Sequence, residues 1–80
     1  MERDYRDVTI DIQTRKLPSD YLWKVSYSLF AWKGDQKTLV SHQLVEETFD
    51  EESEALADAL MTAEKEVDEY LSGEADPSLA

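Results

Sequence analysis

The fold of this chain is decided by two runs of residues, YLWKVSYSLFAWK (21–33) and QKTLVSHQLVEET (36–48), which are separated only by Gly34 and Asp35. Both runs are rich in the aromatic and β-branched residues that favour strands. A Gly-Asp pair between two such runs is typical of a two-residue hairpin loop with glycine first. The loop places Lys33 opposite Gln36 and thereby fixes the register of the whole hairpin.

Opposed residues of a hairpin share a face of the sheet, so this register sorts the side chains into two sets. The mainly apolar face is predicted to hold Trp23 with Glu46, Val25 with Leu44, Tyr27 with His42, and Leu29 with Val40. The other face is predicted to hold Ser26 with Gln43, Ser28 with Ser41, Phe30 with Leu39, and Trp32 with Lys37. His42 is therefore expected to be a hydrogen-bonded structural histidine on the core face.

The segment before the hairpin predicts one more strand. Val8, Ile10 and Ile12 alternate with polar residues over 7–14, which indicates a half-buried strand. Pro18 and the turn-forming pair Ser19-Asp20 provide the connection to the hairpin.

The segment after the hairpin predicts a single long helix. Asp50 is a suitable N-cap, and the apolar pattern ends at Ser72-Gly73, where glycine favours a helix stop. One apolar stripe is expected to contain Leu56, Ala59, Leu60, Ala63, Val67, Tyr70 and Leu71. The acidic run 46–52 is interpreted as a strand end joined to a helix start, because it lacks the ligand spacing of a calcium loop.

The predicted fold class is α+β, a three-stranded antiparallel meander followed by one long C-terminal helix packed on one face (βββα). Residues 1–80 are expected to form a single domain with an ordered core over about 7–72 and a frayed acidic tail over 73–80. The predicted core consists of Val8, Ile10, Ile12, Trp23, Val25, Tyr27, Leu29, Val40, Leu44, Leu56, Leu60, Ala63 and Val67.

Charge is distributed unevenly along the chain. The formal net charge is −11, and residues 38–80 contain thirteen acids but only one base, Lys65. This field opposes direct binding to nucleic acid, which depends on lysine and arginine neutralising phosphate. It also disfavours an anionic membrane surface and favours a basic protein surface.

The outer face of the predicted helix is the first candidate site. Its proposed partner-binding residues are Glu51, Glu54, Asp58, Glu64, Asp68 and Glu69. Carboxylates along a rod of this kind could take the positions that phosphates take along a duplex. The alternative interpretation is a solvated face that is acidic for solubility alone.

The second candidate site is a hydrophobic interface formed by Phe30, Trp32 and Leu39, which the register gathers near the hairpin tip on the face away from the helix. Large aromatic residues are favoured anchors of protein interfaces, and the occupant would be a partner protein or a second copy in a homodimer. In the alternative interpretation, the strand bulges after Ser28 and turns Phe30 and Trp32 inward.

Several classes of function are disfavoured by the residues present. The chain has no cysteine, so disulfide scaffolds and thiolate zinc sites are excluded. There is no phosphate-binding glycine loop and no nucleophile elbow, so we expect neither an enzyme nor a cofactor. A lone His42 predicts no metal site, and no apolar segment resembles a signal peptide or a membrane span, so a cytoplasmic protein is expected.

In its small size, strong acidity and compact sheet with one acidic helix, the chain resembles the phage-encoded inhibitors that mimic nucleic acid, such as anti-CRISPR proteins. The resemblance implies an inhibitor that blocks a basic nucleic-acid-binding host protein, for example a CRISPR effector subunit. Two alternatives remain open: a non-catalytic oligomerising or adaptor protein that uses the exposed aromatic face, and an acidic antitoxin paired with a basic toxin.

Overall fold

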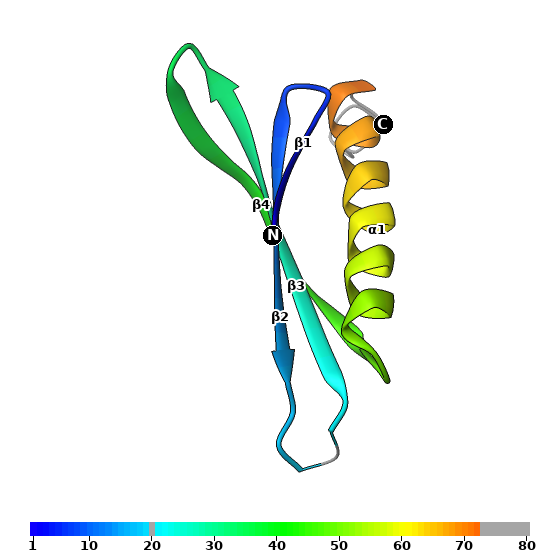
Figure 1. Cartoon of the computed structure of the whole chain (residues 1–80). Coiled ribbons are helices and arrows are strands. Elements are labelled where there is room, and N and C mark those ends of the chain that lie inside the picture. The colour runs from blue at the N-terminus through cyan, green and yellow to red at the C-terminus, as the bar shows by residue number, and fades with distance from the viewer. Residues whose placement is uncertain (20, 73–80) are drawn as a thin grey trace.

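A sheet and one helix form two layers in the computed structural model of the chain (Figure 1), which describes residues 1–19 and 21–72. The elements in chain order are β1 (Glu2–Tyr5), β2 (Val8–Lys16), β3 (Trp23–Lys33), β4 (Gln36–Phe49) and α1 (Glu52–Ser72). The predicted frayed tail over 73–80, the helix stop at Gly73 and the turn residue Asp20 lie outside the described residues. Across the described residues, no helix combines the length and the apolar character needed to cross a membrane.

The sheet has four antiparallel strands in the order β1-β2-β3-β4, so the predicted number of three strands was wrong. The missed strand, β1, pairs with β2 through Tyr5 and Val8. The two residues between them, Arg6 and Asp7, have φ angles of 52° and 67°. A turn with two positive φ angles is usually marked by Asn-Gly, so an Arg-Asp pair gives no hairpin signal in the sequence.

The predicted loop between β3 and β4 is confirmed. Lys33 pairs with Gln36, Trp32 with Lys37, and Phe30 with Leu39. Gly34 has a φ angle of 65°, which a glycine adopts without steric cost.

Beyond the tip, two irregularities change the predicted register. One lies between Trp23 and Val25 and places Phe49, rather than the predicted Glu46, opposite Trp23, and the other is a β-bulge in β4 nearer the tip. Val40 is the extra residue, because Phe30 pairs with Leu39 while Leu29 pairs with Ser41. The shift turns Leu44 to the face away from α1, where it is 63% exposed, so its predicted place in the core was wrong.

The same shift moves His42, which was predicted to lie opposite Tyr27 on the core face. It instead lies opposite Ser28, is exposed, and its Nδ1 atom lies 2.7 Å from the Ser28 hydroxyl. Val45 takes the position opposite Val25 that was predicted for Leu44.

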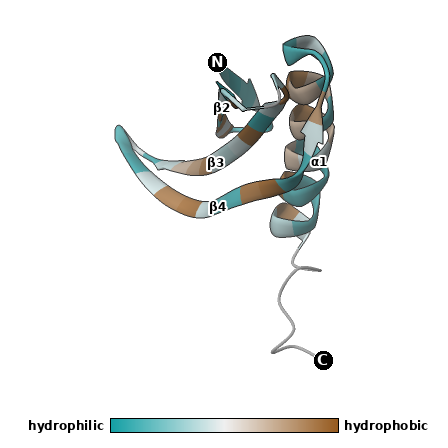
Figure 2. Cartoon of the chain, turned by 90° about the horizontal axis from the view of Figure 1, so that it is seen from below, coloured by the Kyte–Doolittle hydropathy of each residue, from teal (hydrophilic) through white to brown (hydrophobic). Residues whose placement is uncertain are grey.

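The helix covers one face of the sheet, mainly over β2 and β3 (Figures 1 and 2). Its fully buried residues are Ala55, Ala59, Ala63 and Val67, one per turn. Their small side chains let the helix lie close to the apolar sheet residues, which are led by Ile10, Ile12, Val25 and Leu29. The buried stripe is therefore rotated from the predicted one.

The burial of the residues on either side of the stripe shows this rotation. Leu56 and Leu60 are only partly buried, although they pack against the core, and Tyr70 and Leu71 are exposed. The first helical hydrogen bond runs from the Ala55 amide to the Glu51 carbonyl at 3.2 Å, so Glu51 takes the N-cap position that was predicted for Asp50.

Candidate functional site

The predicted acidic residues divide into two groups on the surface of α1. At about 100° per residue, Glu51 at the N-cap and Glu54, Asp58 and Glu69 on α1 fall within one stripe roughly 60° wide, whose centre is about 130° from that of the buried residues. Glu51 and Glu54 are exposed, and Asp58 and Glu69 are half-buried. Glu64 and Asp68 lie on the flank that faces the β1–β2 turn, as the contacts of Asp68 show.

The carboxylate of Asp68 is already bonded to other residues of the same chain. It accepts a hydrogen bond from Arg6 Nη1 at 2.7 Å and another from the Tyr5 hydroxyl at 3.0 Å. Those two bonds hold the pKa of Asp68 below its ordinary value, and the same carboxylate raises the pKa of Tyr5. Asp68 therefore fastens the helix to the β1–β2 turn and is not a free anion.

The other five predicted acids are free of the chain's own cations. Within residues 1–19 and 21–72, no hydrogen bond or ion pair involves the carboxylates of Glu51, Glu54, Asp58, Glu64 and Glu69. Lys65 lies within the acidic stripe and is exposed, but it forms no ion pair with a described residue. These five carboxylates therefore remain available to a cationic partner.

The connection between β4 and α1 contains acidic residues that the predicted site did not include. Glu46 and Glu47 at the end of β4 and Asp50 in the connection are exposed, and they precede Glu51 and Glu54 along the chain. We call these five residues the acidic corner. The run was correctly interpreted as a strand end and a helix start, and it adds Glu46, Glu47 and Asp50 to the exposed acids near the start of α1.

One lysine reaches this region without neutralising it. The Lys24 ammonium donates to the backbone carbonyl of Glu46 at 2.7 Å and leaves the Glu46 carboxylate unpaired. Glu52, the neighbour of the corner, accepts a hydrogen bond from the Thr14 hydroxyl at 2.6 Å, which attaches the first turn of α1 to β2.

The aromatic residues lie together on the uncovered face of the sheet, which we call the open face. Phe30 pairs with Thr9 and Leu39, and Trp32 and Leu39 are 49% and 57% exposed. The alternative of a bulge after Ser28 holds for the place, because the register shifts between Leu29 and Phe30. The extra residue lies in β4, however, so Phe30 keeps its pairing with Thr9 and is not turned inward.

Two contacts that the sequence did not reveal hold this aromatic patch in place. The indole Nε1–H of Trp32 donates to the buried Thr9 hydroxyl at 2.8 Å. The Lys37 ammonium lies 4.7 Å from the centroid of the Phe30 ring and 5.9 Å from that of Trp32. The patch is therefore an ordered surface. The indole N–H of Trp32 has a hydrogen-bond partner, and the ring itself remains exposed.

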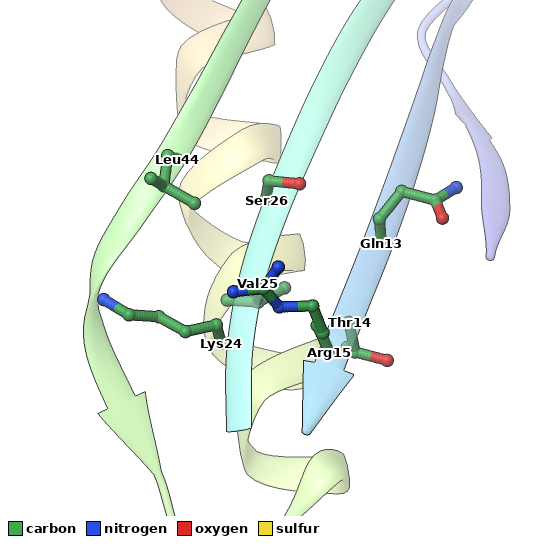
Figure 3. Close-up of a pocket in the computed structure, with 7 residues that line it drawn as sticks. All are labelled: Gln13, Thr14, Arg15, Lys24, Val25, Ser26 and Leu44. Carbon is green, nitrogen blue, oxygen red and sulfur yellow. The ribbon is translucent and has the colours of Figure 1, made fainter. Parts of the chain in front are cut away.

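At the other end of the open face lies a solvent-open hollow of about 490 Å³ (Figure 3). Its lining residues are Gln13, Thr14, Arg15, Lys24, Val25, Ser26 and Leu44. Arg15 and Lys24 are directly opposite in the β2–β3 register, and like charges in that position destabilise a sheet. The hollow was not predicted, because it depends on Leu44 facing outward.

The described residues contain no group of three or more histidine, aspartate or glutamate side chains that could hold a metal ion. Comparisons with protein-family models, with curated proteins and with solved structures find no match.

Proposed function

We propose that this protein is a non-catalytic inhibitor that mimics nucleic acid and blocks a basic nucleic-acid-binding protein, in the manner of anti-CRISPR proteins. The proposal is carried by one observation. Five predicted carboxylates on α1 and at its N-cap have no cationic partner among the described residues, although the chain contains eight lysines and arginines. A cationic protein could pair with these carboxylates without first breaking an intramolecular ion pair.

The spacing of the acids supports the proposal. Glu51, Glu54 and Asp58 follow one another at intervals of three and four residues, which correspond to about 4.5 Å and 6 Å of helix rise. Phosphates on one strand of a duplex are spaced about 3.4 Å along its axis, so these intervals correspond to between one and two phosphate steps. Glu69 extends the same stripe by three further turns.

Part of the arrangement is unfavourable for the helix, although Glu54 lies in the first turn, where the helix dipole favours an acid. Glu51–Glu54 and Glu54–Asp58 are like-charge neighbours, and each pair costs about 0.2–0.5 kcal/mol. The last turn of α1 contains no basic residue, although the helix dipole favours one there. Like-charge neighbours on the helix and a last turn without a cation favour a role in binding over one in helix stability.

The test is competition for a basic protein. Proteins captured from the native host, with nuclease treatment to remove nucleic acid bridges, are purified and mixed with their labelled duplex. Addition of this protein should displace the duplex, and added salt should weaken the complex steeply.

Charge reversals at matched positions separate the acidic stripe from the net charge. Glu54→Lys and Asp58→Lys are compared with Asp35→Lys at the hairpin tip, which makes the same change in net charge at an exposed remote position. The two helix variants should lose inhibition, and the Asp35 variant should retain it. Equal inhibition by all three variants would contradict the proposal.

A second candidate function is favoured by the aromatic patch. An adaptor protein could use Phe30, Trp32 and Leu39 as its working surface, with the acidic helix serving solubility. In that case Trp32→Ala should abolish partner capture while Asp58→Lys leaves it intact.

A further inference from the structure

We propose that the open face is self-complementary and joins two copies of this chain into a twofold-symmetric dimer. The proposal does not depend on the proposed inhibitory function. The helix covers only one side of the sheet, so an anchor and a hollow are left exposed on the other. The anchor is the aromatic patch around Trp32, and the hollow lies between Arg15, Lys24 and Leu44.

The positions of these two features satisfy the symmetry of a dimer. The hollow is centred near Val25 on β3, and Trp32 lies seven residues further along the same strand, about 23 Å away. A twofold axis that runs across the strands near Ser28 exchanges the two ends of the face. Each copy then places its Trp32 over the hollow of the other, so the same contact forms twice.

Charge is complementary under the same operation. Arg15 and Lys24 flank the hollow and have no carboxylate within ion-pair distance among the described residues. Asp4 and Asp7 lie beside Trp32 and line one depression with it. The axis therefore brings Asp4 and Asp7 beside the anchor of one copy to the cations at the hollow of the other. Lys37 also lies at the anchor, but it is paired with Glu2 at 3.9 Å, so the two aspartates still offset the repulsion between Arg15 and Lys24.

The dimer also buries exposed apolar side chains. On β4, Leu44 of one copy meets Leu39 of the other, which buries two leucines that are 63% and 57% exposed in the single chain.

The size of the face indicates a dimer of modest affinity. β2, β3 and β4 lie side by side over the nine residues of β2, and β1 adds four residues, which gives a face of roughly 500 Å² per copy, or about 1,000 Å² in total for two copies. This is the lower limit of specific interfaces. The axis also brings the two Asp11 carboxylates toward each other, which weakens the dimer further.

The experiment is sedimentation equilibrium at about 0.15 M salt, where the repulsion between acidic copies is screened beyond roughly 8 Å. The mass should rise from 9.2 kDa toward twice that value as the concentration approaches some hundreds of micromolar. Trp32→Ala and Leu44→Asp should each weaken the dimer by about tenfold or more. Leu44→Asp alters an exposed side chain, so it keeps the test valid if loss of the Trp32–Thr9 bond disturbs folding.

A charge exchange tests the predicted pairing directly. Arg15→Asp and Asp7→Arg should each favour the monomer, and the double variant should restore the dimer. Met61→Ser, which removes an exposed apolar residue from the outer side of α1, is the control and should leave the mass unchanged. Circular dichroism verifies that every variant is folded.

Two results would overturn the proposal: a 9.2 kDa mass at every concentration, or a dimer that tolerates both Trp32→Ala and Leu44→Asp. The outcome is distinguishable from that of the inhibitor proposal. Glu54→Lys lies on the opposite layer and should abolish competition without changing the mass.

Discussion

The guanidinium of Arg6 and the carboxylate of Asp68 form an ion pair at 2.7 Å that joins the β1–β2 turn to the end of α1. The Tyr5 hydroxyl donates to the same carboxylate. Arg6 has a φ angle of 52°, a backbone conformation that is unfavourable for residues with a side chain. A contact between residues distant in sequence thus holds a turn that its own sequence does not favour.

Asp68→Asn should destabilise the protein at neutral pH and make no difference in strong acid. Because the pKa of Asp68 is lowered in the folded state, its ionised form stabilises the fold above the unfolded-state pKa of about 3.9. That stabilisation is lost as the pH falls through the lower, folded-state pKa. Urea unfolding of both proteins between neutral pH and about pH 2 measures the difference.

The control for this prediction is Glu64→Gln, one turn earlier on the same flank, because no described residue pairs with the Glu64 carboxylate. Its effect on the free energy of unfolding should be small throughout. A difference between wild type and Asp68→Asn that stayed constant down to strong acid would show that the charge of Asp68 is irrelevant.

The parts of the fold that short-range sequence patterns determine were predictable. The parts that depend on contacts between residues distant in sequence were not. Gly34 marks its turn unambiguously, so the hairpin and its first pairs followed from the sequence. The strand β1 did not, because Arg6 and Asp7 depend on Asp68 for support. The bulge at Val40 was also not predictable. Leu44 and Val45 are adjacent apolar residues, and it is Val45 rather than Leu44 that packs against the core.

Asp7→Gly should stabilise the protein. Asp7 has a φ angle of 67°, which glycine adopts without the steric cost that a Cβ atom imposes. Its carboxylate makes no hydrogen bond with a described residue, so little is lost in exchange. We expect the free energy of unfolding to rise by up to about 1 kcal/mol, measured by thermal and urea unfolding.

A matched substitution supports the interpretation of that gain. Asp35→Gly changes the same residue type in the other two-residue turn, where Asp35 does not have a positive φ angle. It should not stabilise the protein, because the added backbone freedom belongs only to the unfolded chain. Equal gains from both substitutions would point to a general charge effect instead.

Ala59→Leu should destabilise the protein by about 1–3 kcal/mol. Ala59 is fully buried between α1 and the sheet, so three additional carbon atoms must displace the helix. Ala57→Leu adds the same atoms at an exposed position of the same helix and should change stability by less than about 0.5 kcal/mol. Similar stabilities for the two variants would mean that the alanines do not set the distance between helix and sheet.

The candidate sites were predictable as side-chain sets but not in their internal contacts. Helical spacing alone places Glu51, Glu54 and Asp58 on one stripe. It could not show that Asp68 is engaged, because its partners Tyr5 and Arg6 are in a strand and turn that were not predicted. The hollow on the open face likewise depends on Leu44, whose direction is set by the bulge.

Tyr27→Phe should remove part of the loss of stability at alkaline pH. Tyr27 is 3% exposed, and its hydroxyl donates to Glu66 at 2.7 Å. Burial, followed by that bond to a carboxylate, raises the pKa of Tyr27 far above 10. The folded state therefore retains the proton while the unfolded chain releases it above about pH 10, so stability is full below that pH and declines as the pH rises. Phenylalanine cannot ionise, so the variant should show a shallower decline. At neutral pH it should be less stable by about 1 kcal/mol, because the Glu66 carboxylate loses its donor. Unfolding by urea from neutral pH to about pH 12, together with the phenolate absorbance of the folded protein, measures both effects.

Tyr5→Phe is the comparison, since the hydroxyl of Tyr5 is also bonded to a carboxylate but lies nearer the surface. An alkaline decline of equal slope in wild type and Tyr27→Phe would show that the Tyr27–Glu66 bond does not couple proton release to unfolding.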